Sequence, residues 1–433
     1  MNEKEKINIK LIVDNDLCIS CGACIHICPF DNIIMSYIKS RGKYDALIKN
    51  ENQCLECNGL KNCLAVCPSY NVNYDELANS KDNDFLGRIE KVYNGYSKDY
   101  NIRFSSSSGG FIRALVKELL DKSLIDGVIS LVHDKGLEYF PKIITDTFKM
   151  PNSIYHNINY EDAIELLKNN KGKYLIIGLP CQITSIELLL KKKFKFLKER
   201  IYAKVALICG YTFDRTNVEF FAKVNKFDID QISYREQGRY KKTRISNKKR
   251  SKLFDIYNPS NIIEKINNNI MFDKWMPQKQ CLFCVDHLGY CADIVVGDAW
   301  QEKYKNDKIG TNIIIVRTKK GHEIVKNLNT VILEEGSLSD IESSQGIYAK
   351  PFLGLTFAKE NIFNDLFVPN HIVSNDFFEF KPIILTLKDK LKIIFLKKLM
   401  RKRYFRLVQL FYIIIEWKYF FKLLIKKIIG RKI

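Results

Sequence analysis

The sequence has no long apolar stretch of the kind that crosses a membrane. In the basic segment toward its C-terminal end, the longest uncharged run, 407–415, has nine residues, whereas a spanning helix needs about 20. Residues 1–17 have no apolar core that would serve as an export signal. We therefore expect a reducing compartment, in which the 13 cysteines serve as metal ligands and not in disulfides.

The sequence also has little that indicates nucleic-acid binding, although its formal net charge is +20. Residues 381–433 contain 16 Lys and Arg against two acids, so +14 of this charge lies in the tail and +6 in the other 380 residues. The basic residues of the tail lie on a strongly apolar segment, and no recognition motif accompanies them. We expect no nucleic-acid partner.

The tail, residues 381–433, permits two interpretations. Its lysines and arginines recur among apolar residues at helical intervals, and Trp417, Tyr419, Phe420 and Phe421 add aromatic side chains. A basic amphipathic helix of this kind is typical of an interfacial anchor that is attracted to anionic lipid. The alternative is a pair of C-terminal helices that pack on the protein and expose a lysine face.

Eight cysteines lie within the first 67 residues, in two groups. The first group, CISCGACIHICPF, has the C-x2-C-x2-C-x3-C-P spacing of bacterial ferredoxins, in which the fourth cysteine ligates the other cluster. The second group, CLECNGLKNCLAVCPSY, has five residues in its middle gap instead of two and keeps the final C-x3-C-P. Crossed ligation predicts two [4Fe–4S] clusters, one held by Cys18, Cys21, Cys24 and Cys67, the other by Cys54, Cys57, Cys63 and Cys28.

A zinc ribbon is the main alternative for these eight cysteines. Zinc sites use four ligands at C-x2-C spacing, however, and not eight in this interleaved order. We therefore expect residues 1–75 to form a small α+β domain of the bacterial ferredoxin type, held together by its clusters. Residues 76–104 are expected to be a connector.

Strand and helix patterns alternate in the part of the chain that follows the connector. Apolar runs predict buried strands at 128–132, 173–179 and 203–209, with helical patterns between them. This alternation predicts an α/β core with a largely parallel sheet over residues 105–350. The basic segment 241–252 within it is expected to be a hairpin or a mobile loop.

A second set of cysteines lies in this core. Cys281, Cys284 and Cys291 form C-x2-C-x6-C just before a predicted strand, which predicts a third [4Fe–4S] cluster; zinc binding, or no bound metal, is the alternative. A fourth ligand is required, and two further cysteines follow predicted strands, at the end where α/β folds place their sites. The candidates for the fourth ligand are Cys181, Cys209, Asp286 and His287.

The run SSSSGG precedes a helical pattern in the first unit of the core. Hydroxyls and exposed amides at a helix N-terminus favour phosphate, so this run is interpreted as a cradle for the diphosphate of a flavin nucleotide. A plain helix cap is the alternative. The predicted cofactor contacts are Ser107, Ser108, Gly109, Gly110 and, in the motif GDAW, Asp298.

Five motifs occur in the order SSSSGGFIRALVKELL, IDGVI, GLPCQITSIELLL, LICGY and CLFCVDHLGYCADIVVGDAW. In these motifs the segment 85–350 resembles the beta subunit of coenzyme F420 hydrogenase and dehydrogenase. The resemblance implies an iron–sulfur flavoprotein that binds FAD and a core [4Fe–4S] cluster, although no residue set here indicates a deazaflavin pocket. It assigns that cluster to Cys281, Cys284 and Cys291, with Cys181 or Cys209 as the fourth ligand.

The resemblance further implies an oxidoreductase. Electrons would pass from ferredoxin or another donor through the clusters and a flavin to an organic acceptor. Bacterial chains of this architecture occur among surface-polysaccharide synthesis enzymes, which suggests a sugar-linked acceptor. We expect a cytoplasmic protein whose tail lies at the inner face of the membrane; the alternative is a non-enzymatic electron carrier or redox-sensing scaffold there.

Overall fold

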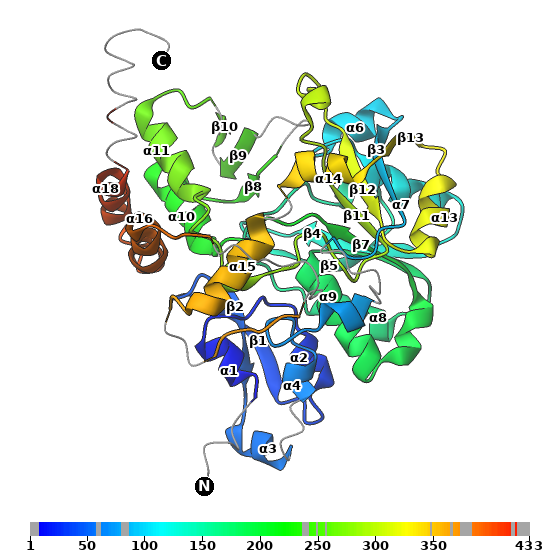
Figure 1. The fold of residues 1–433 in the computed structure, drawn as a ribbon, viewed down its shortest axis with the longest axis horizontal. Helices are drawn as coiled ribbons and strands as arrows, with labels where there is room; N and C mark the ends of the chain where they lie inside the picture. Colours follow the sequence, from blue (N-terminus) through cyan, green and yellow to red (C-terminus); the bar gives the residue numbers. More distant parts are fainter. Residues whose placement is uncertain are drawn as a thin grey trace.

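A computed structural model describes residues 8–57, 62–78, 86–235, 242–247, 250–255, 258–346, 349–363, 367–372, 383–416 and 421. Figure 1 shows three parts: a cysteine-rich N-terminal module (residues 8–78), a sheet domain (86–363) and a helical C-terminal segment (383–416) on the flank of the sheet domain. In the described part of the chain, no helix has the length and apolar character that a membrane span requires.

The N-terminal module contains an antiparallel hairpin surrounded by short helices. Its two strands pair from Ile33↔Ile48 to Ile38↔Lys43. The cysteine motifs lie on and between the helices, so the module has little regular structure apart from the hairpin. Its elements are α1 (Lys10–Asp14), α2 (Ala23–Ile27), β1 (Ile33–Ile38), β2 (Lys43–Ile48), α3 (Glu51–Glu56), α4 (Asn62–Ala65) and α5 (Tyr74–Ala78).

The sheet domain is built on eight strands: β3 (Lys91–Ser97), β4 (Gly127–His133), β5 (Tyr139–Ile144), β6 (Tyr174–Gly178), β7 (Ile201–Leu207), β11 (Ile294–Asp298), β12 (Asn312–Val316) and β13 (Val331–Gly336). Their order is β13-β3-β12-β11-β7-β6-β4-β5. The four strands β11, β7, β6 and β4 are parallel, and antiparallel strands extend the sheet on both sides. The predicted α/β core is confirmed, with its parallel part at the centre.

Helices cover both faces of this sheet, which is why its central strands are apolar throughout. On one face, α8 and α9 contribute apolar side chains to a core that also includes residues of the N-terminal module. On the other face, α7 and α13 cover the sheet. The helices and 3₁₀ turns here are α6 (Tyr100–Ser105), α7 (Phe111–Asp121), α8 (Asp162–Asn169), α9 (Pro180–Lys192), α13 (Lys319–Lys326), α14 (Leu338–Gln345), Thr147–Lys149, Lys195–Arg200 and Glu302–Tyr304.

Within the sheet domain, a smaller layer lies beside the eight-stranded sheet, over its own apolar core. It includes an antiparallel hairpin that pairs from Lys242↔Asp255 to Asn247↔Arg250. A hairpin is one of the two structures expected for the basic segment 241–252. Helix α12 (Lys279–Phe283) lies next to the module, because Leu282 and Phe283 pack against apolar residues of the module. The elements are α10 (Arg215–Val224), β8 (Gln231–Ser233), β9 (Lys242–Asn247), β10 (Arg250–Asp255), α11 (Ile262–Met271) and α12 (Lys279–Phe283).

The expected connector 76–104 is wrong as a description of this segment, because it includes β3, an interior strand of the large sheet. The sequence of β3, KVYNGYS, carries polar residues at positions that alternation would assign to the core, and this hides the strand. Asn94 is nevertheless buried, and its side-chain oxygen accepts from Gln301 Nε2 at 2.7 Å. Gly95 gives room for β13, since a Cβ there would lie 2.5 Å from the Ile332 carbonyl oxygen.

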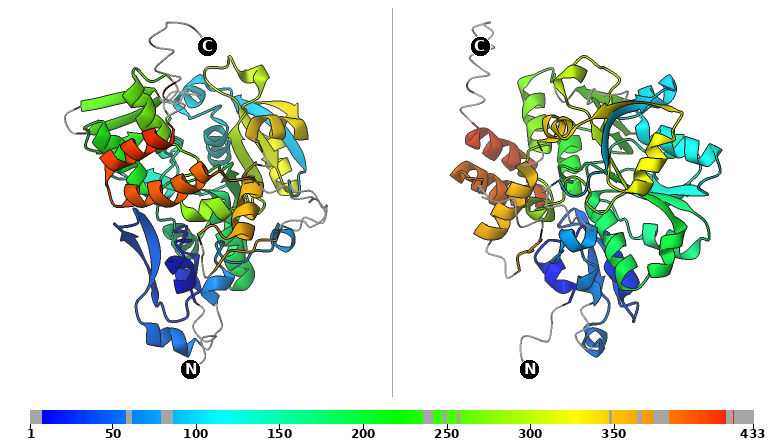
Figure 2. Two further views of the ribbon diagram at one scale, coloured as in Figure 1. Left: turned by 60° about the vertical axis from the view of Figure 1, so that its left-hand side comes forward. Right: turned by 45° about the vertical axis from the view of Figure 1, so that its right-hand side comes forward.

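The C-terminal segment packs along α10 and α11, as the views in Figure 2 show. Leu396, Met400 and Val408 are completely buried in the core of that layer. The packed-helix interpretation therefore holds for 387–415; residues 417–420 and 422–433 lie outside the described residues. Helix α15 precedes the segment, and the elements are α15 (Ala349–Glu360), α16 (Leu387–Leu391), a π-helical turn (Lys392–Leu396), α17 (Lys397–Arg401) and α18 (Phe405–Ile415).

Arg401 joins all three parts of the molecule. Its guanidinium lies 2.7 Å from a carboxylate oxygen of Asp16 in the N-terminal module and 2.7 Å from one of Asp214 in the sheet domain. Burial alone would raise the pKa of Asp16, but the charges of Lys43 and Arg401 outweigh it and hold that pKa well below its usual range. The ion pairs therefore stabilise the assembled chain wherever Asp16 is ionised.

Arg401→Ala should destabilise the protein by about 2 kcal/mol, because it removes the charged hydrogen-bond donor that Asp16 and Asp214 share. Lys43, 2.9 Å from Asp16, and Lys397, 3.8 Å from Asp214, remain and limit the loss. Thermal unfolding of the anaerobic holoprotein at pH 7 measures this as a lower midpoint. The matched variant Lys402→Ala, on an exposed neighbour, should unfold like the parent. The difference in unfolding midpoint between Arg401→Ala and the parent should decrease as the pH falls below about 3.9, where Asp16 would be protonated in the unfolded chain. Equal midpoints for the two variants at pH 7 would contradict the bridging role of Arg401.

Candidate functional site

The N-terminal module meets the sheet domain through close backbone contacts. Gly22 has a φ of +77°, and a Cβ added to it would lie 2.2 Å from the Cβ of Glu161. The Ser20 carbonyl oxygen accepts a hydrogen bond from the Tyr160 amide at 2.9 Å. The loop of the first cysteine group is thereby held against the segment that leads into α8.

The first three cysteines of the first group and the last cysteine of the second come together inside the module. Cys18, Cys21, Cys24 and Cys67 are all buried. Burial raises the pKa of Cys24 well above its ordinary value, and the negative charges of the other three raise it further. Four thiolates cannot persist in such a place without a cation or a metal centre.

The remaining four cysteines of the module lie farther out, next to α3. Cys28, Cys54, Cys57 and Cys63 are each partly exposed. Burial raises the pKa of Cys54 and of Cys57, and the next cause in both is the charge of Cys28. The two sets that crossed ligation requires are thus adjacent in the structure, although part of the long gap, residues 58–61, lies outside the described residues.

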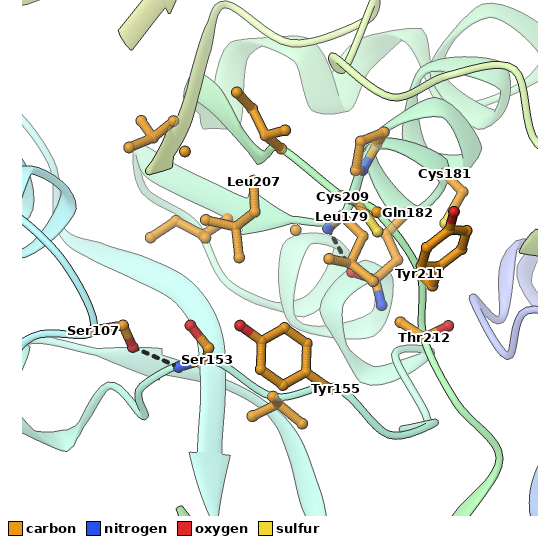
Figure 3. Close-up of a pocket in the computed structure, with 18 of the residues that line it drawn as sticks. Ser107, Ser153, Tyr155, Leu179, Cys181, Gln182, Leu207, Cys209, Tyr211 and Thr212 are labelled. Atoms are coloured by element: carbon orange, nitrogen blue, oxygen red, sulfur yellow. Dashed lines mark hydrogen bonds between the residues drawn. The ribbon is translucent and has the colours of Figure 1, made fainter. Parts of the chain in front are cut away.

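A cavity of about 660 Å³ lies where the module meets the sheet domain. This volume is within the range of roughly 300–1,000 Å³ that is usual for small-molecule sites. Ile19 and Pro68, which each follow a cysteine of the buried set, form part of its wall. Figure 3 shows the lining of the cavity, with Ser107, Ser153 and Tyr155 on one side.

Four further cysteines line the other side of this cavity. Cys181 lies in the first turn of α9, directly after β6, and Cys209 follows β7, so both lie at the carboxyl ends of adjacent parallel strands (Figure 3). Cys281 in α12 and Cys284 at its C-terminal cap complete the group. Burial raises the pKa of Cys181 well above its ordinary value, and the charges of the other three raise it further.

Cys291, which the spacing predicts as a ligand, lies apart from these four. It is buried in the core on the α9 side of the sheet, outside the cavity lining, and burial raises its pKa to about 12. The loop between Cys284 and Cys291 turns at Gly289, which has a φ of +67° and packs so closely on β7 that a Cβ would lie 2.7 Å from the Cβ of Ala206. We therefore assign the proposed core cluster to Cys181, Cys209, Cys281 and Cys284.

The surroundings of these four sulfurs suit an anionic cluster. Among the described residues, no three His, Cys, Asp or Glu side chains are arranged to hold a single metal ion. Lys350 is 5% exposed, and its Nζ donates to the Cys209 carbonyl oxygen at 2.6 Å. A buried ammonium offsets the charge that a thiolate-bound [4Fe–4S] cluster would bring.

Ser107 and Ser108 of the SSSSGG run line the cavity, and each side chain already makes one hydrogen bond. Ser107 Oγ accepts from the amide of Ser153 at 2.9 Å (Figure 3), and Ser108 Oγ donates to the carbonyl oxygen of Thr311 at 3.3 Å. Ser107 retains a hydroxyl proton, and Ser108 retains its acceptor lone pairs. The two side chains can therefore contact a polar ligand in the cavity.

The two glycines of this run have different positions. Gly110 lines the cavity and precedes α7 with a φ of +74°. Gly109 is not part of the lining, because it faces Asn312: a Cβ there would lie 2.2 Å from Asn312 Oδ1. The same oxygen accepts from the amide of Phe111 at 3.1 Å, so the helix N-terminus is partly satisfied from within the protein.

Asp298, at the end of β11, also lines the cavity and forms an ion pair with Arg235 at 2.6 Å. Arg235 is 3% exposed and lies 5.9 Å from the ring centroid of Trp300.

Three residues of the cavity lining were missed in the sequence analysis: Arg235, Tyr155 and Lys350. Arg235 borders an uninformative basic segment, and Lys350 lies in a region without a recognisable motif.

Three family models match parts of the chain. Residues 17–72 match the 4Fe-4S dicluster domain. Residues 92–153 match the N-terminal part of the coenzyme F420 hydrogenase/dehydrogenase beta subunit, and residues 171–340 match its C terminus. The two beta-subunit matches together span more than half of the chain.

Individual relatives are distant. An uncharacterized protein of Methanocaldococcus jannaschii is 26% identical over 352 residues, which cover 72% of this chain and 87% of that protein. One of the subunits of the F(420)H(2) dehydrogenase of Methanosarcina mazei is 22% identical over 315 residues, covering 69% and 82% respectively. A chain in a structure of the F420-reducing [NiFe] hydrogenase complex from Methanosarcina barkeri is 16% identical, covers 67% of this chain and 98% of its own length, and has a TM-score of 0.49.

Serine substitutions distinguish the ligand set that we propose from the cavity lining, Cys181, Cys209, Cys281 and Cys284, from the one that spacing predicts. Cys209→Ser and Cys281→Ser should each lower the iron content of the anaerobically isolated protein by about four atoms per chain, the content of one [4Fe–4S] cluster. Cys291→Ser should keep the parent's iron, because this side chain does not face the cavity. Iron analysis together with the paramagnetic resonance spectrum of the reduced protein measures both. Iron loss in Cys291→Ser with full iron in Cys209→Ser would restore the prediction from spacing.

Proposed function

We propose that this chain, which belongs to the family of coenzyme F420 hydrogenase/dehydrogenase beta subunits, passes electrons between a ferredoxin-type donor and an organic acceptor. It is an iron–sulfur electron-transfer protein with a 4Fe-4S dicluster domain. The observation that supports the proposed transfer of electrons is the succession of three cysteine sets from the surface of the module to one cavity. Two clusters in the module and a third in the core would make this succession a path for single electrons.

The order of the path follows from exposure. Cys54 and Cys57 are partly exposed near α3, where a protein donor can approach. The buried set comes next, and Cys21 is close enough to α9 that Ser185 lowers the pKa that burial has raised. Cys181 lies one helical turn before Ser185 on α9, so this helix connects the buried set with the core set. Electrons would thus move from α3 to the cavity.

The cavity would hold a flavin, which we propose to be FAD. A flavin exchanges electrons singly with clusters and in pairs with a hydride carrier. Ser107, Ser108 and Gly110 would contact its phosphates. The Asp298–Arg235 ion pair would hold the polar end of the ligand in place, and the apolar remainder of the lining would exclude water.

The acceptor is proposed to be a small organic molecule that takes a hydride. A nucleotide- or lipid-linked sugar is our candidate, from the association of similar bacterial chains with surface-polysaccharide synthesis. Coenzyme F420, which the description of the family carries, is the comparison substrate. The donor is proposed to be ferredoxin or another redox protein of a larger complex, since one relative is part of a dehydrogenase.

The C-terminal segment is proposed to hold the protein at the cytoplasmic face of a membrane. Its inward basic residues are paired with the body: Lys392 lies 2.6 Å from Asp273, and Arg403 lies 2.8 Å from Glu219. Its outward face combines exposed apolar side chains with exposed basic ones, a combination that suits an anionic lipid surface. The exposed residues are Ile384, Leu387, Ile394, Phe395, Leu407, Leu410, Ile414, Lys390, Lys398, Lys402 and Arg406.

The redox proposal is tested on the parent and on Cys57→Ser after anaerobic purification. The parent should contain about twelve iron atoms per chain, four for each cluster, together with the absorbance of a bound flavin. In Cys57→Ser, reduced ferredoxin should no longer reduce the flavin at the parent's rate, whereas a small reductant that enters the cavity should still do so. A parent with about eight iron atoms and no flavin would overturn the proposal in favour of a plain electron carrier or redox-sensing scaffold.

Vesicle sedimentation tests the membrane proposal. The full chain should bind vesicles that contain phosphatidylglycerol, bind phosphatidylcholine vesicles weakly, and lose binding as salt screens its basic residues. The double variant Phe395→Ser/Leu410→Ser should bind less, because it removes exposed apolar side chains from this face. Leu124→Ser, which changes another exposed leucine elsewhere (42% exposed, against 55% for Leu410), is the control. No sedimentation of the parent with anionic vesicles would refute this part.

A further inference from the structure

Lys350 occupies an unusual position for a lysine. It is the second residue of the twelve-residue helix α15, and it lies at the positive end of the helix dipole, where cations are disfavoured. It is nevertheless buried. Its ammonium donates to the Cys209 carbonyl oxygen and lies 5.9 Å from the ring centroid of Tyr211. Such a placement is unfavourable unless negative charge lies nearby.

That negative charge comes from the core cysteines. Burial alone would lower the pKa of Lys350, but the charges of the four sulfurs outweigh burial and raise it. Within the described part of the chain, no carboxylate forms an ion pair with Lys350. Asp286 is the nearby acid, and the charge of Lys350 acts on it. However, Arg317 acts on Asp286 more strongly, and Asp286 accepts hydrogen bonds from the amides of Gly289 and Tyr290 at 2.7 and 3.3 Å.

Helix α15 is fixed against the cysteine loop, so the ammonium is held in place. Gly354, one turn after Lys350 on the same face of the helix, contacts the loop directly. A Cβ at Gly354 would lie 2.7 Å from the carbonyl oxygen of Cys284 and 2.9 Å from that of Phe283. The absence of a side chain there lets the helix approach closely enough for Lys350 to reach Cys209.

The lysine beside the buried set of the module has different surroundings. Lys43 donates to the Cys18 carbonyl oxygen at 3.1 Å and is completely buried, so it resembles Lys350 in position. However, its Nζ also lies 2.9 Å from Asp16 and 3.5 Å from Asp45. Two carboxylates therefore offset the charge of Lys43, whereas the charge of Lys350 acts mainly on the four sulfurs.

On the basis of the proposed function, we infer that Lys350 is a positioning residue that raises the reduction potential of the core cluster above the potentials of the two module clusters. Reduction adds a negative charge to a cluster, and a fixed cation in a medium of low dielectric constant stabilises the reduced form. The core cluster then takes the electron in preference to the module, and electrons collect next to the cavity. Lys350 acts through the cluster and does not touch the acceptor.

The test is a redox titration of the anaerobic full chain, followed by paramagnetic resonance, for the parent, Lys350→Met, Lys350→Gln, Lys350→Arg and Lys359→Met. In Lys350→Met the core cluster should be harder to reduce by at least about tenfold in its equilibrium constant, which is about 59 mV for one electron. Lys350→Arg keeps the charge and should keep the potential. Lys359→Met removes a charge from the exposed end of the same helix and should leave all potentials unchanged.

The module clusters of the same samples serve as internal references. A core potential that stays at the parent's value in Lys350→Met, with full iron content, would overturn the inference, as would an equal shift of all clusters. Loss of core iron in both Lys350→Met and Lys350→Gln would also overturn it, because Lys350 would then be needed for assembly and not for the potential. If the parent protein shows no signal from a third cluster, the proposed function itself is refuted. This outcome can be distinguished from a failure of the inference about Lys350 alone.

Discussion

Burial of cysteine sulfur is the constraint on which this structure depends. A buried thiolate is costly unless a metal centre or a fixed cation accepts its charge. This chain gathers twelve cysteines into three groups, of which the core group lines the cavity. The sulfurs of Cys18, Cys21, Cys24 and Cys67 lie inside the module, and the core group lies at the ends of two parallel strands. Each group has its own electrostatic surroundings, which range from partial exposure near α3 to a buried ammonium at Lys350.

The second requirement is that the groups stay close together. The module shares its apolar core with α12 and α15, and it is also held by contacts that tolerate no added atoms, such as the one between Gly22 and Glu161. Arg401 then ties the C-terminal segment to both other parts. The basic tail therefore has two faces with different roles: its inward charges complete the fold, and its outward apolar and basic side chains remain for the proposed contact with lipid.

Local spacing explains what could be predicted from the sequence. The C-x2-C-x2-C-x3-C-P run and the five ordered motifs report short-range geometry, so the dicluster domain, the family and the α/β core were predictable. The position of Cys291 and the ligands of the third cluster were harder to predict, because the loop between Cys284 and Cys291 turns at a single left-handed residue, Gly289. Lys350 and Arg235 reach the cavity only through the tertiary approach of α15 and of the segment after β8, which no local pattern reports. Strand β3 was missed because its buried Asn94 is satisfied by Gln301, a residue more than 200 positions away.

The proposed electron path requires three clusters in succession, with the third bound by Cys181, Cys209, Cys281 and Cys284. Anomalous diffraction at the iron absorption edge, from crystals grown without oxygen, would locate them. We expect three separate iron centres in each chain, the innermost beside these four sulfurs and Lys350. Iron confined to the N-terminal module, or an iron centre bound to Cys291, would contradict it.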